Sequence, residues 1–146
     1  MSLLLGTRNS ADQTVAVGGT IDLGSVYRKY CRKVNGIKAF DFNGTSIALQ
    51  QSGIYHITAT VIATSSAAGN VTIQMFENGI AIPGALGTDT FSTTTQLKTL
   101  TIDVYVIVDN GCLLGQPTTL AKNISLQVLE TAATINNVVV NVEKVV

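Results

Sequence analysis

The side chains best able to do chemistry are few in this sequence, and they lie far apart. His56 is the only histidine among 146 residues, and a lone imidazole cannot form a catalytic triad without a nucleophile and an orienting acid. The carboxylates stand singly, with no pair at a spacing that favours acid/base catalysis. We therefore predict no enzymatic activity and no cofactor. We interpret His56 as a surface or interface residue, with a pH switch as the weaker alternative.

No metal site is predicted either. Asp109-Asn110-Gly111 lacks the further oxygen ligands of a calcium loop. Cys31 and Cys112 are 81 positions apart, without a CxxC spacing or a neighbouring histidine. The pattern favours two buried free thiols, and a disulfide between them stays open.

A short basic stretch is the remaining candidate for binding chemistry. It consists of Arg28, Lys29, Arg32 and Lys33, and with nearby Lys38 it holds more than half of the nine Lys and Arg residues. One interpretation is a contact with an anionic partner, such as a cell-wall polymer or a sulfated glycan. The alternative, which we favour, is a solvated surface balanced by Asp22 and Asp41.

The composition limits the classes of function. Charged residues make up only 12% of the chain and the formal net charge is zero, so nothing draws it generally to nucleic acid or to a membrane surface. Hydrophobic residues make up 46%, which argues against disorder and suggests that more than one surface is hidden from water, as in an oligomer. No segment approaches the roughly 18 apolar residues of a membrane span, and no signal peptide is visible.

The elements that must position these residues are predicted to be strands. Apolar residues alternate with polar ones over residues 55–63, 71–75, 100–108, 124–128 and 138–142. Asn78-Gly79 is a strong signal for a two-residue hairpin turn. Because no helical segments separate these strands, we predict an all-β fold of two antiparallel sheets. We expect a flexible N-terminal segment over residues 1–11 and a single domain over residues 12–146.

Residues 23–34 are ambiguous. Leu23, Val26, Tyr27, Tyr30, Cys31 and Val34 follow a helical spacing. Tyr and Val are equally common in strands, so an amphipathic helix from about Ser25 and a strand both remain open.

Several segments together resemble a known family. Gly53-Ile54-Tyr55-His56-Ile57 resembles the glycine-x-tyrosine strand start of complement globular heads and tumour-necrosis-factor-like jelly rolls. Residues 67–74, followed by residues 77–85, are similar to small bacterial and phage members related to the C-terminal domains of spore-surface collagen-like proteins. Residues 13–19 resemble the family's opening strand and turn, and residues 137–144 its last strand. The basic stretch from Arg28 to Lys33 is more charged than the family pattern.

The resemblance implies a jelly-roll sandwich that assembles as a homotrimer and carries no catalytic residues. Such domains serve as trimerising and recognition heads on stalks, spores or phage particles, so we expect a virion or bacterial surface protein.

The alternation also predicts which side chains form the trimer interface. With the apolar faces in the core, five large side chains point outward and would be shielded by other copies: Phe76, Tyr105, Ile107, Leu129 and Val139. The alternative is that loops cover them, or that a bulge shifts the register.

A competing function is a carbohydrate- or receptor-binding module. Its specificity would come from loops at residues 65–69, 85–95 and 111–119, in which Phe91 is the one aromatic side chain.

Overall fold

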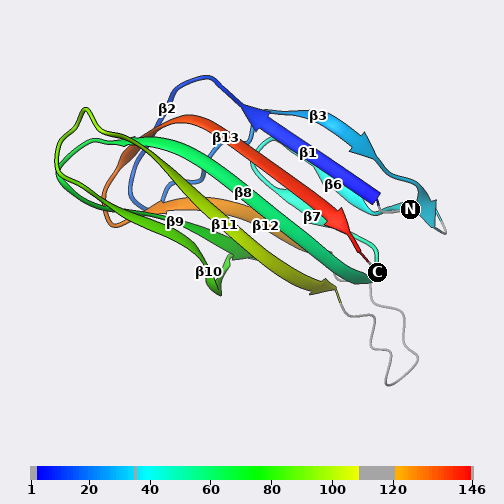
Figure 1. Ribbon diagram of the computed structural model, residues 1–146. Coiled ribbons are helices and arrows are strands. Elements are labelled where there is room, and N and C mark those ends of the chain that lie inside the picture. Colours follow the sequence, from blue (N-terminus) through cyan, green and yellow to red (C-terminus); the bar gives the residue numbers. More distant parts are fainter. Residues whose placement is uncertain (1–2, 35, 109–120, 146) are drawn as a thin grey trace.

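The computed structural model describes residues 3–34, 36–108 and 121–145, and it confirms the antiparallel all-β sandwich (Figure 1). The strands within these residues are β1 (Leu3–Asn9), β2 (Gln13–Val15), β3 (Ser25–Tyr30), β4 (Lys33–Val34), β5 (Ile37–Lys38), β6 (Phe40–Phe42), β7 (Ile47–Leu49), β8 (Gly53–Ser65), β9 (Gly69–Glu77), β10 (Ile80–Phe91), β11 (Leu97–Val108), β12 (Lys122–Leu129) and β13 (Ala133–Lys144).

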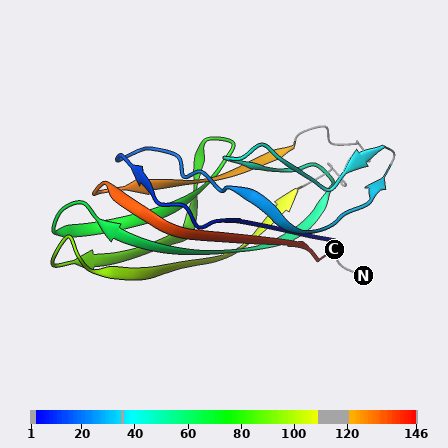
Figure 2. The same cartoon turned by 90° about the horizontal axis from the view of Figure 1, so that it is seen from above.

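Two sheets form the layers of the sandwich (Figure 2). The first, called sheet A, has the order β11-β8-β13-β1-β3, with β2 also paired to β13. The second, sheet B, has the order β10-β9-β12-β7-β6, and β4 and β5 form a separate short hairpin. Leu3 pairs with Lys144, so both ends of the described chain lie at the same end of sheet A.

The period-two pattern predicted the core faces correctly. Along β8, Tyr55, Ile57, Ala59, Val61 and Ala63 are all buried, whereas His56, Thr58, Thr60, Ile62 and Thr64 point to the outer side of sheet A. The alternating apolar residues of β9, β12 and β13 are buried in the same way. The two sheets therefore enclose one apolar layer between them, as the pleat of a half-buried strand requires.

Aromatic packing fixes one end of this core. The rings of Phe40 and Tyr55 meet edge to face, with centroids 5.8 Å apart and an interplanar angle of 73°. The Tyr55 hydroxyl donates a hydrogen bond of 2.6 Å to the carbonyl of Gln51. Burial raises the pKa of Tyr55 to about 12.

The structure decides one question that the sequence left open and overturns two expectations about local structure. Of the two alternatives for residues 23–34, Ser25–Tyr30 forms the strand, because it pairs with β1 along the edge of sheet A. Leu3–Asn9, expected to lie in a flexible segment, forms β1 between β13 and β3, with Leu3 and Leu5 in the core.

The second wrong expectation concerns the loop at residues 85–95. Strand β10 runs through to Phe91, whose ring is buried, so the connection to β11 is much shorter and offers no exposed aromatic side chain. Residues 66–68 do connect β8 to β9, as expected. The candidate loop at residues 111–119 and Cys112 lie outside the described residues, and Cys31 is half-buried.

Candidate functional site

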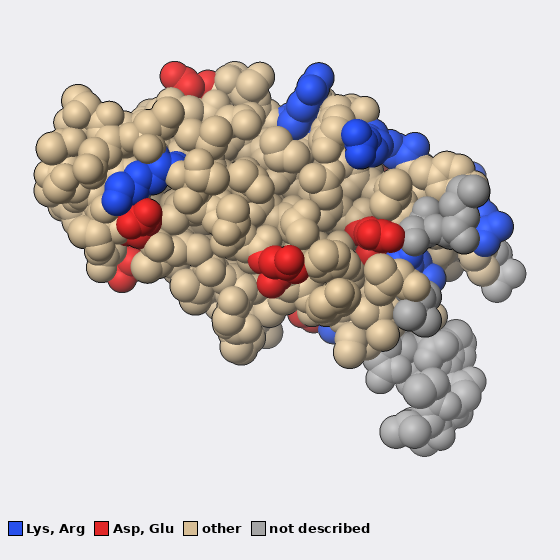
Figure 3. Space-filling model, in the orientation of Figure 1, with Lys and Arg blue, Asp and Glu red and all other residues tan. Residues whose placement is uncertain are grey.

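The outer face of sheet A, the side turned away from sheet B, gathers the residues of most interest. It bears few charged side chains over most of its area (Figure 3). Pairing across the strands sets Tyr105 of β11 opposite His56 of β8 and His56 opposite Glu143 of β13; Glu143 lies opposite Leu4 of β1. His56 and Glu143 are thus adjacent polar residues, with the Tyr105 ring on one side of them and Leu4 on the other.

Three of the five predicted interface residues lie on this face. Tyr105 and Ile107 on the edge strand β11 are 63% and 58% exposed, and Leu97 at the start of the same strand is exposed too. Val139, two strands away on β13, is half-buried. Exposure of large apolar side chains along one edge strand is unfavourable in water.

Phe76 and Leu129 are not part of this group. They lie on β9 and β12, on the outer side of sheet B, and both are half-buried. Alternation in the sequence identifies which residues point outward but not from which sheet. The structure therefore divides the predicted interface between two opposite faces.

His56 is held by two neighbours on β11. Its ring stacks on Tyr105 with centroids 4.7 Å apart and an interplanar angle of 19°. Its Nε2 lies 2.5 Å from Oδ1 of Asp103. The sequence placed His56 on the outer face, but it did not reveal these partners, because only the register of β8 with β11 brings them together.

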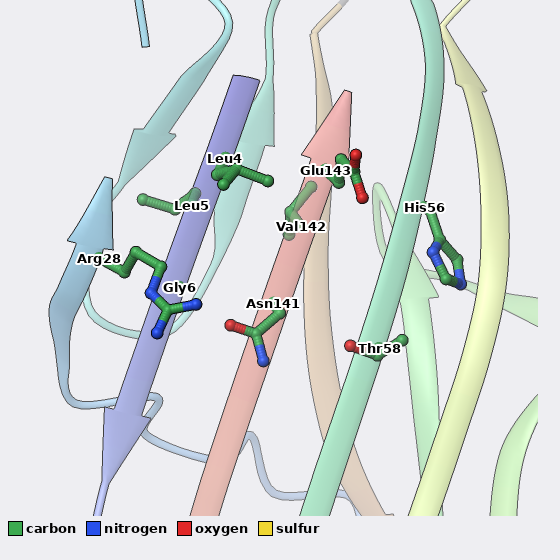
Figure 4. A pocket seen from close by; sticks show the side chains of 9 residues that line it. All are labelled: Leu4, Leu5, Gly6, Arg28, His56, Thr58, Asn141, Val142 and Glu143. Carbon is green, nitrogen blue, oxygen red and sulfur yellow. The ribbon is translucent and has the colours of Figure 1, made fainter. Parts of the chain in front are cut away.

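A shallow hollow of about 210 Å³ lies on this face between β3, β1, β13 and β8 (Figure 4). Its floor includes Gly6 and Thr58, and Arg28 and Glu143 stand at its sides. The hollow is smaller than the roughly 300–1,000 Å³ of typical small-molecule pockets. It is therefore better suited to receive a side chain than a whole substrate.

Gly6 makes room for Tyr27 beside this hollow. A Cβ atom at Gly6 would lie 2.9 Å from the Tyr27 ring and 2.8 Å from Oδ1 of Asn141. The Tyr27 hydroxyl donates to that same oxygen at 2.7 Å. The guanidinium groups of Arg8 and Arg28 lie over the Tyr27 ring, 5.3 and 5.5 Å from its centroid. The tyrosine thus joins three strands of sheet A.

The predicted basic residues do come together. We define the basic surface as six exposed residues of β1, β3, β4, β5 and the adjoining turn: Arg8, Arg28, Lys29, Arg32, Lys33 and Lys38. Every side chain of β3 is exposed, including Lys29, which lies opposite the buried Leu5. Strand β3 therefore extends beyond the cover of sheet B and presents cations on both of its sides.

Other chemistry finds little support in the described part of the chain. Within residues 3–34, 36–108 and 121–145, no three His, Cys, Asp or Glu side chains are grouped so that they could hold a metal ion. The described residues also contain no helix of the length and apolarity needed to cross a bilayer.

Comparisons with known proteins place the fold. No protein-family model and no curated protein matches the sequence. Among solved structures, murine APRIL is similar with a TM-score of 0.69 and 8% identity, over 99% of this chain and 100% of that one. The globular domain of zebrafish complement 1qA gives a TM-score of 0.66 with 6% identity, over 99% and 98% of the two chains.

A third similar structure is the vertex protein P5 of PRD1, with a TM-score of 0.55 and 16% identity, over 99% of this chain and 97% of that one. All three likenesses extend over nearly the whole chain. The protein therefore has the tumour-necrosis-factor-like and complement-head-like jelly-roll fold that its sequence resembles.

Proposed function

We propose that this protein is a non-catalytic structural and interaction domain that associates with itself as a homotrimer. The observation that carries the proposal is the exposure of apolar side chains along β11, Tyr105 and Ile107 near its end and Leu97 at its start, at the edge of a sheet face with few charges. The trimeric assembly that the family resemblance implies would remove these side chains from water.

The energy available from burial is adequate. Fully burying one large apolar side chain contributes about 1.5–3 kcal/mol. Leu97, Tyr105 and Ile107 would bury in each of three copies, which makes several such contributions before Val139 is counted. Tyr105 is already held by stacking on His56, so less side-chain freedom is lost on association.

The geometry of the outer face favours association over catalysis. His56 is the one histidine, and its two close neighbours are an exposed phenol and a carboxylate. The hollow beside it is open and small. Many enzymes enclose their substrate in a pocket that excludes water, and the open hollow beside His56 does not provide one.

A place on a virus particle or a bacterial surface is part of the proposal. The similarity in fold to the PRD1 vertex protein P5 supports it, as does the resemblance of the sequence to small phage and spore-surface members. A binding module for surface glycans is the second candidate, and the exposed basic strand β3 is the observation that favours it.

Sedimentation equilibrium of the purified protein tests the proposed assembly. We expect a single species of three times 15.3 kDa at micromolar concentration, with little change when the salt concentration is raised, because apolar contacts are not screened. A monomer throughout the micromolar range would contradict the proposal.

A further inference from the structure

The basic surface concentrates positive charge in one region of a protein whose formal net charge is zero. Its six residues are two thirds of the nine Lys and Arg side chains of a chain with zero formal net charge. All six are exposed, and they belong to the edge of sheet A formed by β1 and β3 and to the β4–β5 hairpin. In Figure 3 most of the blue side chains lie over the upper right of the molecule.

Within the described residues, none of these cations forms an ion pair. The lysine ion pairs found there join Lys98 to Asp89 and Lys122 to Glu77. Asp22 and Asp41, the carboxylates expected to balance the basic stretch, instead accept hydrogen bonds from the backbone N–H groups of Gly24 and Phe42. Among the described residues, neither carboxylate is therefore paired directly with a cation of the basic surface, whose side chains face solvent.

Two of the cations directly oppose each other. Lys33 of β4 pairs with Lys38 of β5 in the antiparallel register, which puts both side chains on one face of the hairpin. Directly opposed residues have Cβ atoms about 4.5–5.5 Å apart, and like charges in that arrangement are destabilising. An anionic group held between the two ammonium groups would remove this repulsion.

The backbone of the hairpin is fixed to the core, so the strand positions that carry Lys33 and Lys38 are set before any ligand arrives. The side-chain amide of Gln51 donates to the carbonyls of Arg32 and Ile37 at 3.1 and 2.8 Å. The carbonyl of Gln51 accepts the hydrogen bond of the buried Tyr55 hydroxyl. A preorganised surface loses less entropy on binding than a mobile one.

The aromatic residues indicate the kind of polymer. Tyr30 is 48% exposed and lies opposite Leu4, on the same side of β3 as Arg28; an exposed ring beside a cation suits the apolar face of an anionic sugar. The Tyr27 ring is already engaged by Arg8, Arg28 and Asn141. Single-stranded nucleic acid is bound by several free aromatic platforms, and this surface offers one.

We propose that the basic surface binds an anionic polysaccharide that carries sulfate or phosphate groups, with an anionic group between Lys33 and Lys38 and a sugar ring on Tyr30. The site extends the second candidate function, and it is complete within one chain. Assembly of several copies would add avidity but is not required for binding.

Binding of heparin oligosaccharides to the purified protein, measured by calorimetry, tests the proposal. We expect saturable binding that weakens at least about tenfold between 50 and 200 mM salt, since charge neutralisation drives it. The variant Lys33→Gln/Lys38→Gln is expected to bind at least about tenfold more weakly, through loss of charge-assisted contacts.

The matched control is Lys98→Gln/Lys122→Gln, which changes the net charge equally at lysines outside the surface. It should bind as the unchanged protein does. Equal weakening in both variants, or no heparin binding by the unchanged protein, overturns the proposal. Thermal unfolding of Lys33→Gln/Lys38→Gln should show no loss of stability, because a repulsive pair is removed; a destabilised variant also counts against the proposal.

Polyphosphate and a single-stranded oligonucleotide complete the set of probes. Tyr30→Ala should weaken the binding of heparin and leave that of polyphosphate unchanged. Tighter binding of the oligonucleotide than of heparin would replace the polysaccharide with nucleic acid and overturn the proposal. Heparin binding that persists when self-association is abolished separates this site from the proposed trimer.

Discussion

Tyr105 and His56 lie directly opposite each other on β11 and β8, and their rings stack with centroids 4.7 Å apart. Asp103, two residues before Tyr105, forms a hydrogen bond with Nε2 of the same imidazole. An exposed tyrosine on an edge strand is thus kept in one orientation by its neighbours. Aromatic side chains are enriched at interfaces between proteins, so an ordered tyrosine on a weakly charged face fits the proposed self-association.

The contact between Gly6 and Tyr27 predicts that alanine at position 6 destabilises the protein, and that removal of the Tyr27 ring reduces this loss of stability. Gly6→Ala places a methyl group 2.9 Å from the Tyr27 ring, and we expect it to lower the free energy of unfolding by about 1–3 kcal/mol through overpacking. In a Tyr27→Ala background the same change should cost less, because the ring is gone and the Asn141 side chain, released from its hydrogen bond to Tyr27, can move away from the new methyl group. Chemical denaturation of the four proteins measures this, and an equal cost in both backgrounds would mean that the ring does not set the constraint.

Gly24 and Gly84 have the same backbone conformation but different surroundings, so a comparison of their alanine variants separates backbone strain from steric overlap. Both have positive φ, +80° and +78°, so alanine at either position costs about 1–2 kcal/mol of backbone strain. A Cβ at Gly24 would also lie 2.2 Å from the carbonyl oxygen of Arg8, whereas nothing lies within 4 Å at Gly84.

We therefore expect Gly24→Ala to destabilise the protein by about 3 kcal/mol or more and Gly84→Ala by much less. Thermal or urea unfolding distinguishes the two variants. Similar losses would show that the close approach of Gly24 to β1 is not rigid.

Tyr55 predicts a loss of stability at alkaline pH. Burial raises its pKa from 10.0 to about 12 in the folded protein, so the neutral phenol is favoured by folding. Its contribution is fully present below pH 10, and it is lost as the pH rises from 10 through 12, because the unfolded state ionises first. A shift of this size corresponds to about 2–3 kcal/mol.

Urea unfolding at pH 8 and pH 11 checks this effect. Tyr55→Phe should lose less stability between these two conditions than the unchanged protein. Tyr105→Phe, which removes an exposed hydroxyl instead, is the control and should retain the full loss. An identical pH dependence in all three proteins would rule out Tyr55 as the source.

The fold was predictable because the long strands carry clean alternation. Residues 55–63 and 100–108 each have one apolar side, and the pleat converts that pattern directly into a buried face. The pattern fails where a strand has no buried side. Ser25–Tyr30 is exposed on both sides, so nothing in its sequence distinguishes a strand from a helix, and its pairing with β1 decides the outcome.

The site was predicted only in part, because contacts between distant strands depend on the register. Tyr105, Ile107 and Val139 were identified as outward residues on what proved to be one face, whereas Phe76 and Leu129 belong to the other sheet. Neither the stacking of His56 on Tyr105 nor the opposition of Lys33 and Lys38 can be derived from composition or spacing. Both follow from pairings fixed by the whole fold.

The proposed self-association through the outer face of sheet A is tested most directly by the mass in solution of two variants in which an exposed isoleucine is replaced by aspartate. Ile107→Asp puts a carboxylate among the exposed apolar side chains of β11. Ile80→Asp makes the same change at a residue that is 73% exposed in the β9–β10 hairpin, away from sheet A. By light scattering at the same micromolar concentration, we expect Ile107→Asp to shift to monomer and Ile80→Asp to remain at three times 15.3 kDa. An Ile107→Asp protein that keeps the trimeric mass would contradict self-association through the outer face of sheet A.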